Sequence, residues 1–163
     1  MFFGVSALQS FHVAISLVGI AVGLWVMLQL IASNRAPFAT AVFLGTTLVT
    51  LLTGFFFPIT SFTPALGVGI VSTLVMAATL LARYGKGMRG RWREVYVIGA
   101  VASLYLNVFV LVVQLFLKVP ALNALAPTGT EPPFAMAQGV TLAVFATIGF
   151  LAWKGFRPAV STI

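Results

Sequence analysis

The side chains of this sequence that are suited to chemistry are few, and most of them are uncharged. Ser103, Asn107 and Gln114 follow Gly99 at spacings of four, four and seven residues, so a helix would carry all four residues on one face. In an apolar surrounding, amides need hydrogen-bond partners. Together with Gln138, this polar stripe predicts either interhelical hydrogen bonds in a bundle core or the lining of a polar cavity, pore or headgroup site.

A second stripe of helical spacing lies near the start of the chain and contains His12, Ser16, Gly19 and Gly23. Gly19 and Gly23 form a GxxxG motif, which predicts tight helix packing within the chain or between copies, as does Gly99 in the first stripe. His12 is expected near an outer boundary as a hydrogen-bonded side chain. The alternatives are a haem ligand, which would need a second ligand from elsewhere, or a proton sensor.

The scarcity of cysteine, histidine and acidic residues excludes most catalytic chemistry. The chain has no cysteine, one histidine and two acids, so thiolate chemistry, a disulfide and a multi-histidine metal site within one chain are excluded. The two acids, Glu94 and Glu131, are expected on opposite sides of a membrane and form no carboxylate pair. We therefore expect no catalytic residue, no metal and no cofactor in a protein that is not an enzyme.

The elements that position these residues follow from composition. The chain has 163 residues, of which 61% are hydrophobic and 7% charged, a balance typical of membrane proteins rather than soluble ones. A bilayer core takes about 20 apolar residues as helix. We predict one all-α domain over residues 1–163, a bundle of five transmembrane helices without internal charges, at about 13–32, 40–59, 64–82, 95–117 and 134–153.

The positive charges predict how such a bundle is oriented. Eight of the nine basic residues fall on one side of the five spans, and only Lys118 falls on the other. Because short cytoplasmic loops retain Lys and Arg, we expect the N-terminus outside and the C-terminus in the cytoplasm. The absence of charged residues within the spans argues against proton-coupled transport.

The loop between the third and fourth predicted spans holds most of this charge. The net charge of +7 is explained by topology, so we expect no nucleic acid partner. Beyond topology, the loop is expected to attract anionic lipid headgroups of the bilayer or a cytoplasmic partner. The residues concerned are Arg83, Lys86, Arg89, Arg91 and Arg93.

The connection between the last two predicted spans, residues 118–133, contains four prolines. Proline fixes one backbone dihedral and stiffens a segment. We expect an ordered, extended cap over the bundle.

Two strings, LYLNVFVLVVQLFLKVPALNALAPTGTEPPF at residues 104–134 and LTGFFFP at residues 52–58, resemble segments of an uncharacterised family of short polytopic bacterial inner-membrane proteins. The resemblance would cover most of the chain from the second span onward. It implies a multi-pass protein of the bacterial inner membrane and brings no activity, ligand or site residue.

The leading functional prediction is a non-enzymatic membrane protein that acts as an interaction partner, a small homo-oligomer or an accessory subunit of a membrane assembly. One alternative is a passive channel or carrier for a small neutral solute or lipid, which would use Ser103, Asn107, Gln114 and Gln138. Another is binding of a hydrophobic cofactor, quinone or haem, with His12 as a contact.

Overall fold

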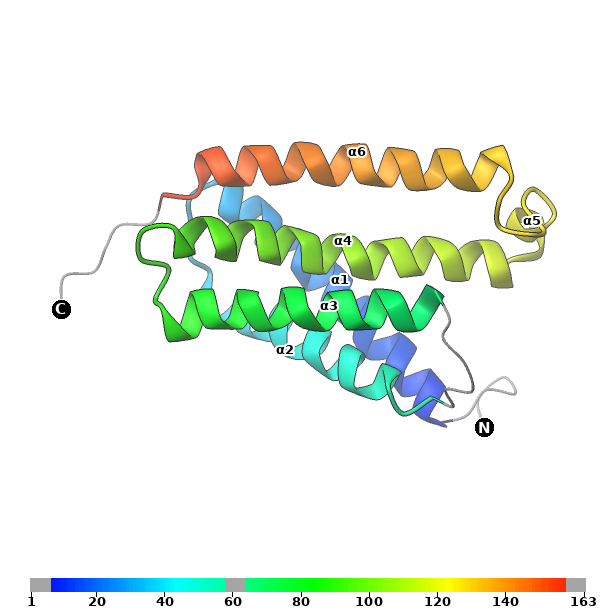
Figure 1. Ribbon diagram of the computed structural model, residues 1–163, viewed down its shortest axis with the longest axis horizontal. Coiled ribbons are helices and arrows are strands. Elements are labelled where there is room, and N and C mark those ends of the chain that lie inside the picture. The colour runs from blue at the N-terminus through cyan, green and yellow to red at the C-terminus, as the bar shows by residue number, and fades with distance from the viewer. Residues whose placement is uncertain (1–6, 58–63, 158–163) are drawn as a thin grey trace.

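A computed structural model describes residues 7–57 and 64–157, and all regular secondary structure of these residues is helical (Figure 1). Five of its helices are long and apolar enough to span a membrane, which confirms the predicted all-α architecture with five candidate spans. The helices are α1 (Ala7–Ile31), α2 (Pro37–Gly54), α3 (Pro64–Leu80) with its π-helical continuation η1 (Leu81–Gly85), α4 (Trp92–Lys118), the short α5 (Pro120–Asn123) and α6 (Pro132–Gly155).

Proline and glycine set several of these boundaries. Pro37 and Pro132 open α2 and α6, where the missing amide hydrogen of proline costs no helical hydrogen bond. α2 ends at Gly54 rather than at 59, because residues 55–57 form turns whose amides bond back to Leu52, Thr53 and Gly54. The end of the predicted second span and the linker 60–63 lie outside the described residues.

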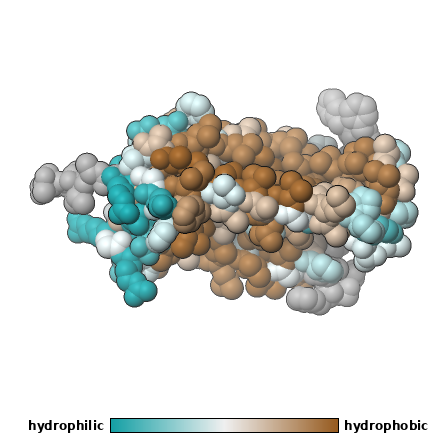
Figure 2. Space-filling view, turned by 90° about the horizontal axis from the view of Figure 1, so that it is seen from above, coloured by the Kyte–Doolittle hydropathy of each residue, from teal (hydrophilic) through white to brown (hydrophobic). Residues whose placement is uncertain are grey.

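The five long helices run in alternating directions along the chain (Figure 1). Residues 32–36, 81–93 and 154–157 therefore gather at one end of the bundle, which we call the basic end because it carries eight of the nine Lys and Arg residues. α5 and the other residues between α4 and α6 lie at the opposite end. Polar surface is concentrated at the ends, with a broad apolar belt between them (Figure 2).

Close packing in the bundle depends on glycines at helix contacts. Gly23 of α1 lies so close to Phe43 and Leu104 that a Cβ atom built on it would be 2.8 and 2.7 Å from their side chains. Gly99 of α4 fits against Thr79 of α3 in the same way. Small residues let helix backbones approach each other and so strengthen packing contacts in lipid. These contacts join α1, α2, α3 and α4 around a common core.

The connection at the opposite end is folded rather than extended, contrary to the expectation for residues 118–133. α5 makes one helical turn, and the side-chain amide of Asn123 donates to the Phe116 carbonyl at 3.1 Å. Glu131 then closes the loop: its carboxylate accepts hydrogen bonds from the Thr128 amide (3.1 Å), the Thr128 hydroxyl (2.9 Å) and the Thr130 amide (3.0 Å). Local side-chain acceptors thus order a proline-rich loop that chain stiffness alone would leave extended.

Replacing Glu131 should loosen this loop in a pH-dependent way. Desolvation acts to raise the pKa of the Glu131 carboxyl, but its hydrogen bonds with Thr128 and Thr130 outweigh this and lower the pKa below its usual value. The ionised Glu131 carboxylate therefore stabilises the loop above the usual carboxyl pKa of about 4.3. This stabilisation is lost as the pH falls through the lowered pKa. In Glu131→Ala, amides 128–131 should exchange hydrogen faster than in the parent at neutral pH, and the ratio of the two rates should approach one in acid. A ratio that does not change with pH would contradict this account.

Filling the space at Gly99 should destabilise the bundle. Gly99→Ala forces a methyl group against Thr79, and overpacking of this kind costs about 1–3 kcal/mol. Gly45→Ala is the matched control, because a Cβ atom at Gly45 would meet nothing within 4 Å. Thermal unfolding in mild detergent should show a lower midpoint for the Gly99 variant alone. Equal midpoints for the two variants would show that the α3–α4 contact is looser than described.

Candidate functional site

The predicted polar stripe is divided among different surroundings. The Asn107 amide of α4 donates to the Thr47 hydroxyl of α2 at 3.2 Å, and Ser103 is buried with no hydrogen-bond partner for its hydroxyl among the described residues. Gln114, two turns further along α4, is exposed, at the end where Figure 1 shows α2 sloping away from α4. The stripe is therefore an interhelical contact at its centre and surface at its end.

Gln138 belongs to another contact. It lies on α6, and its amide nitrogen donates to the Phe109 carbonyl of α4 at 3.1 Å. Its amide oxygen is buried and has no partner within the described chain. The structure thus brings Asn107 to α2 and Gln138 to α4, and does not bring the two amides together.

The glycines of the GxxxG motif face the interior of the chain. Gly19 is buried beside Thr46 and Thr47 of α2, and Gly23 beside Phe43 and Leu104. Both glycines therefore serve packing within one chain, and their face of α1 is already occupied by α2 and α4.

His12 lies near the start of α1 and joins it to the end of α2. Its Nδ1 atom is 2.8 Å from the Thr53 hydroxyl, and its ring meets the Phe57 ring edge-on with centroids 5.3 Å apart. The Thr53 hydroxyl donates to the Val49 carbonyl at 2.8 Å, so its oxygen is left to accept from Nδ1–H. His12 is thus held as a hydrogen-bonded side chain with Nε2 as its remaining acceptor.

The basic residues of the loop differ sharply in their surroundings. Lys86, Arg89 and Arg91 are exposed. Arg83 is only 8% exposed: its guanidinium donates to the Arg35 carbonyl at 3.3 Å and lies over the Tyr96 ring at 5.0 Å. It is a buried cation held by a carbonyl and a ring face, with no carboxylate beside it in the described chain.

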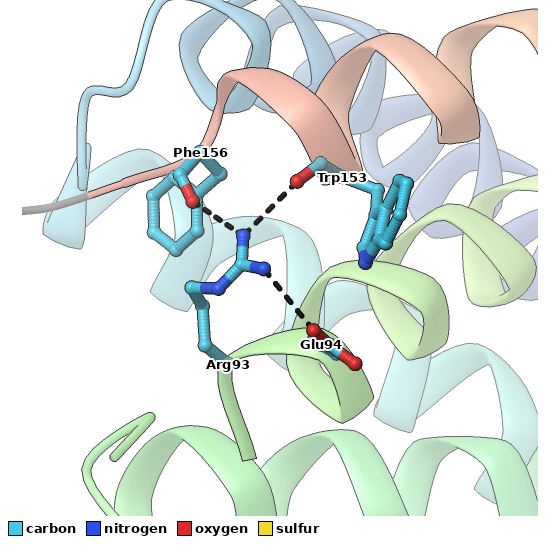
Figure 3. Close-up of polar contacts among 4 residues, drawn as sticks. All are labelled: Arg93, Glu94, Trp153 and Phe156. Atoms are coloured by element: carbon cyan, nitrogen blue, oxygen red, sulfur yellow. Dashed lines mark hydrogen bonds and ion pairs between the residues drawn. The ribbon is translucent and has the colours of Figure 1, made fainter. Parts of the chain in front are cut away.

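Arg93 is also engaged within the protein (Figure 3). One of its nitrogens donates to the carbonyls of Trp153 and Phe156, at 3.0 and 2.7 Å, and the other lies 3.4 Å from the Glu94 carboxylate. The carbonyls at the end of a helix lack partners within the helix and carry partial negative charge. Arg93 therefore caps α6 from the start of α4. The sequence did not predict this role, because Arg93 and Trp153 lie 60 positions apart.

Of the five candidate spans, α6 is the most exposed. Only Phe145 and Ala152 of its 24 residues are buried, and 6% of its most apolar stretch lies inside the protein against 39% for α4. Figure 2 looks onto this side of the bundle and shows an almost continuous apolar surface. Bulky side chains such as Met136 and Val140 project from it, with exposed fractions of 68% and 64%.

A stripe of small residues runs along the exposed side of α6. Its members recur every four residues and are all exposed: Ala135, Gly139, Ala143 and Thr147. We call this stripe the α6 small-residue face. A Cβ atom at Gly139 would meet nothing within 4 Å. Sequence reasoning passed over the stripe, although its spacing is the signal that would have found it.

The arrangement offers no metal centre in the described residues. No three His, Asp or Glu side chains of residues 7–57 and 64–157 come together, and Glu94 and Glu131 lie at opposite ends of the bundle. Comparison of the chain with protein-family models, curated proteins and solved structures gave no match. The resemblance to bacterial inner-membrane proteins therefore stays a prediction.

Removing the Arg93 cap should destabilise the end of α6. Arg93→Gln loses both carbonyl contacts, and hydrogen bonds to charged groups contribute about 1.5–3 kcal/mol. Arg91→Gln, which removes the same charge from an exposed neighbour, is the matched control. Hydrogen exchange of residues 152–157 should be faster in the Arg93 variant than in the control. Equal exchange rates in the two variants would mean that the loss of a positive charge, and not the loss of the Arg93 hydrogen bonds, destabilises the end of α6.

Proposed function

We propose that the protein is a non-enzymatic integral membrane protein that forms a small homo-oligomer through the α6 small-residue face. We place it in the bacterial inner membrane, with its basic end in the cytoplasm. The observation that carries the proposal is the exposure of Ala135, Gly139 and Ala143 on a helix that the rest of the bundle barely covers.

Helix chemistry supports an α6–α6 contact. Lipid tails are as apolar as leucine, so burying bulky apolar side chains gives little drive to associate. Association instead favours faces where small residues let two backbones approach, and Gly139 leaves an open position in the middle of such a face. A two-fold contact would place the same face of both copies together.

The basic end supports the proposed orientation. Eight of the nine basic residues lie there, and the rule that cytoplasmic loops retain Lys and Arg puts that end inside the cell. Trp92 and Trp153 lie at the same end, as expected of aromatic residues at a membrane boundary.

Cross-linking tests the proposed contact, because the chain has no cysteine of its own. Ala143→Cys would place a single thiol on the α6 small-residue face. Oxidation in native membranes should then give a covalent dimer. Leu74→Cys, on α3 and 67% exposed, is the matched control and should stay monomeric.

A second substitution tests whether close approach is required. Gly139→Leu in the Ala143→Cys background should weaken association by roughly tenfold, which corresponds to about 1.4 kcal/mol, with unchanged thermal unfolding of the monomer. Equal cross-linking of the Ala143→Cys and Leu74→Cys variants would contradict the proposal. A different protein cross-linked in place of a second copy would also contradict self-association.

A further inference from the structure

The basic end contains a groove formed by the loop between α3 and α4. Its volume is about 500 Å³, and it is lined by Tyr84, Gly85, Lys86, Gly87, Arg89 and Trp92. Positive residues are needed at this end for orientation alone, but orientation requires no groove. The groove is therefore a feature that the topology rule does not explain.

The cations of the groove are free to bind an anion. Lys86 and Arg89 are exposed, and neither side chain makes a hydrogen bond or ion pair with another residue of the described chain. The Lys86 ammonium lies 5.8 Å from the centre of the Trp92 ring, which orients it without neutralising it. No acid lines the groove, and the nearest acid in sequence, Glu94, is paired with Arg93.

A buried charge next to Tyr84 adds to the positive potential near the groove. The Arg83 guanidinium lies 5.7 Å from the centre of the Tyr84 ring, and Tyr84 lines the groove. Because a buried cation without a carboxylate is costly, an anion bound nearby would stabilise Arg83. Arg83 thus adds to the positive charge near the groove without lining it.

The loop that forms the groove is held in shape by its backbone. The Lys86 amide donates to the Leu81 carbonyl at 2.8 Å and the Met88 amide to the Ala82 carbonyl at 2.9 Å. Gly87 and Gly90 have φ of 58° and 54°, a region that glycine adopts without strain. Met88, at φ 59°, adopts it at a cost that the two glycines do not have. These backbone hydrogen bonds and turns within the loop give the groove its shape.

The aromatic residues indicate which anion the groove would meet. Trp and Tyr favour the level of the lipid headgroups; Trp92 begins α4, and Tyr84 is 59% exposed in η1. In a bilayer spanned by the five apolar helices, these aromatic residues would bring the groove to the headgroup region of the adjacent leaflet.

We propose that this groove is a binding site for the phosphate headgroup of an anionic phospholipid, with Lys86 and Arg89 as its contacts and Trp92 as the side wall. The site does not depend on the α6 contact, so either proposal can fail without the other. Of the five basic residues that the sequence singled out, the structure assigns two to this headgroup and commits Arg83 and Arg93 to contacts within the protein.

The test compares two variants of equal charge change. Lys86→Gln/Arg89→Gln removes the groove cations, and Lys154→Gln/Arg157→Gln removes two exposed cations from the same end outside the groove. The purified full chain in non-ionic detergent is titrated with phosphatidylglycerol, and bound lipid is counted by native mass spectrometry. At about 1 kcal/mol for each basic residue, the groove variant should bind roughly thirtyfold more weakly, while the control binds like the parent.

Each other outcome overturns the proposal. Equal weakening in the two variants would indicate non-specific attraction, and no weakening in either would place the lipid elsewhere. Inorganic phosphate is the probe for a free anion: if it raises the unfolding temperature as much as phosphatidylglycerol at the same concentration, the groove is not a lipid site. If the double variant fails to fold in the non-ionic detergent, Lys86→Gln alone should still weaken binding by roughly fivefold, and unchanged binding in that variant would overturn the site.

Discussion

The bundle depends on close backbone approach at a few small residues. Where lipid surrounds the helices, apolar side chains gain little by leaving it, so contacts form where backbones meet or polar groups pair. Gly23 admits Phe43 and Leu104, and Gly99 admits Thr79. The hydrogen bonds of Asn107 and Gln138 then join α4 to α2 and to α6. The exposed side of α6 is a helix face that these contacts leave uncovered.

Much of the fold could be predicted from the sequence because a spanning helix is a local property. A run of about 20 uncharged apolar residues marks each span, and Pro64 marks the start of α3 as the sequence indicates. The early end of α2 and the turn of α5 could not be predicted, because they depend on backbone hydrogen bonds at Phe55 and on the Asn123 amide meeting Phe116. Those contacts leave no periodic pattern in the sequence.

The candidate site was harder to predict, because the role of each residue depends on contacts with residues far away in the sequence. Arg83 and Arg89 look alike in a basic loop, but only Arg83 reaches the Arg35 carbonyl, 48 residues away. Gln114 continues the stripe of Asn107 by spacing, yet only Asn107 meets α2. Spacing shows which residues share a helix face. It does not show where the neighbouring helix stops covering that face.

The contacts at the end of α6 join this helix to segments that are synthesised before it. The Arg157 amide donates to the Ser33 hydroxyl at 2.8 Å, Gly155 lies against the backbone of Ile31, and Arg93 holds the carbonyls of Trp153 and Phe156. α1 and α4 precede α6 in the chain, so the residues that contact the end of α6 are synthesised before α6 itself. The helix that carries the proposed contact between copies is thus the last of the five to be made, and pairing would follow completion of each bundle.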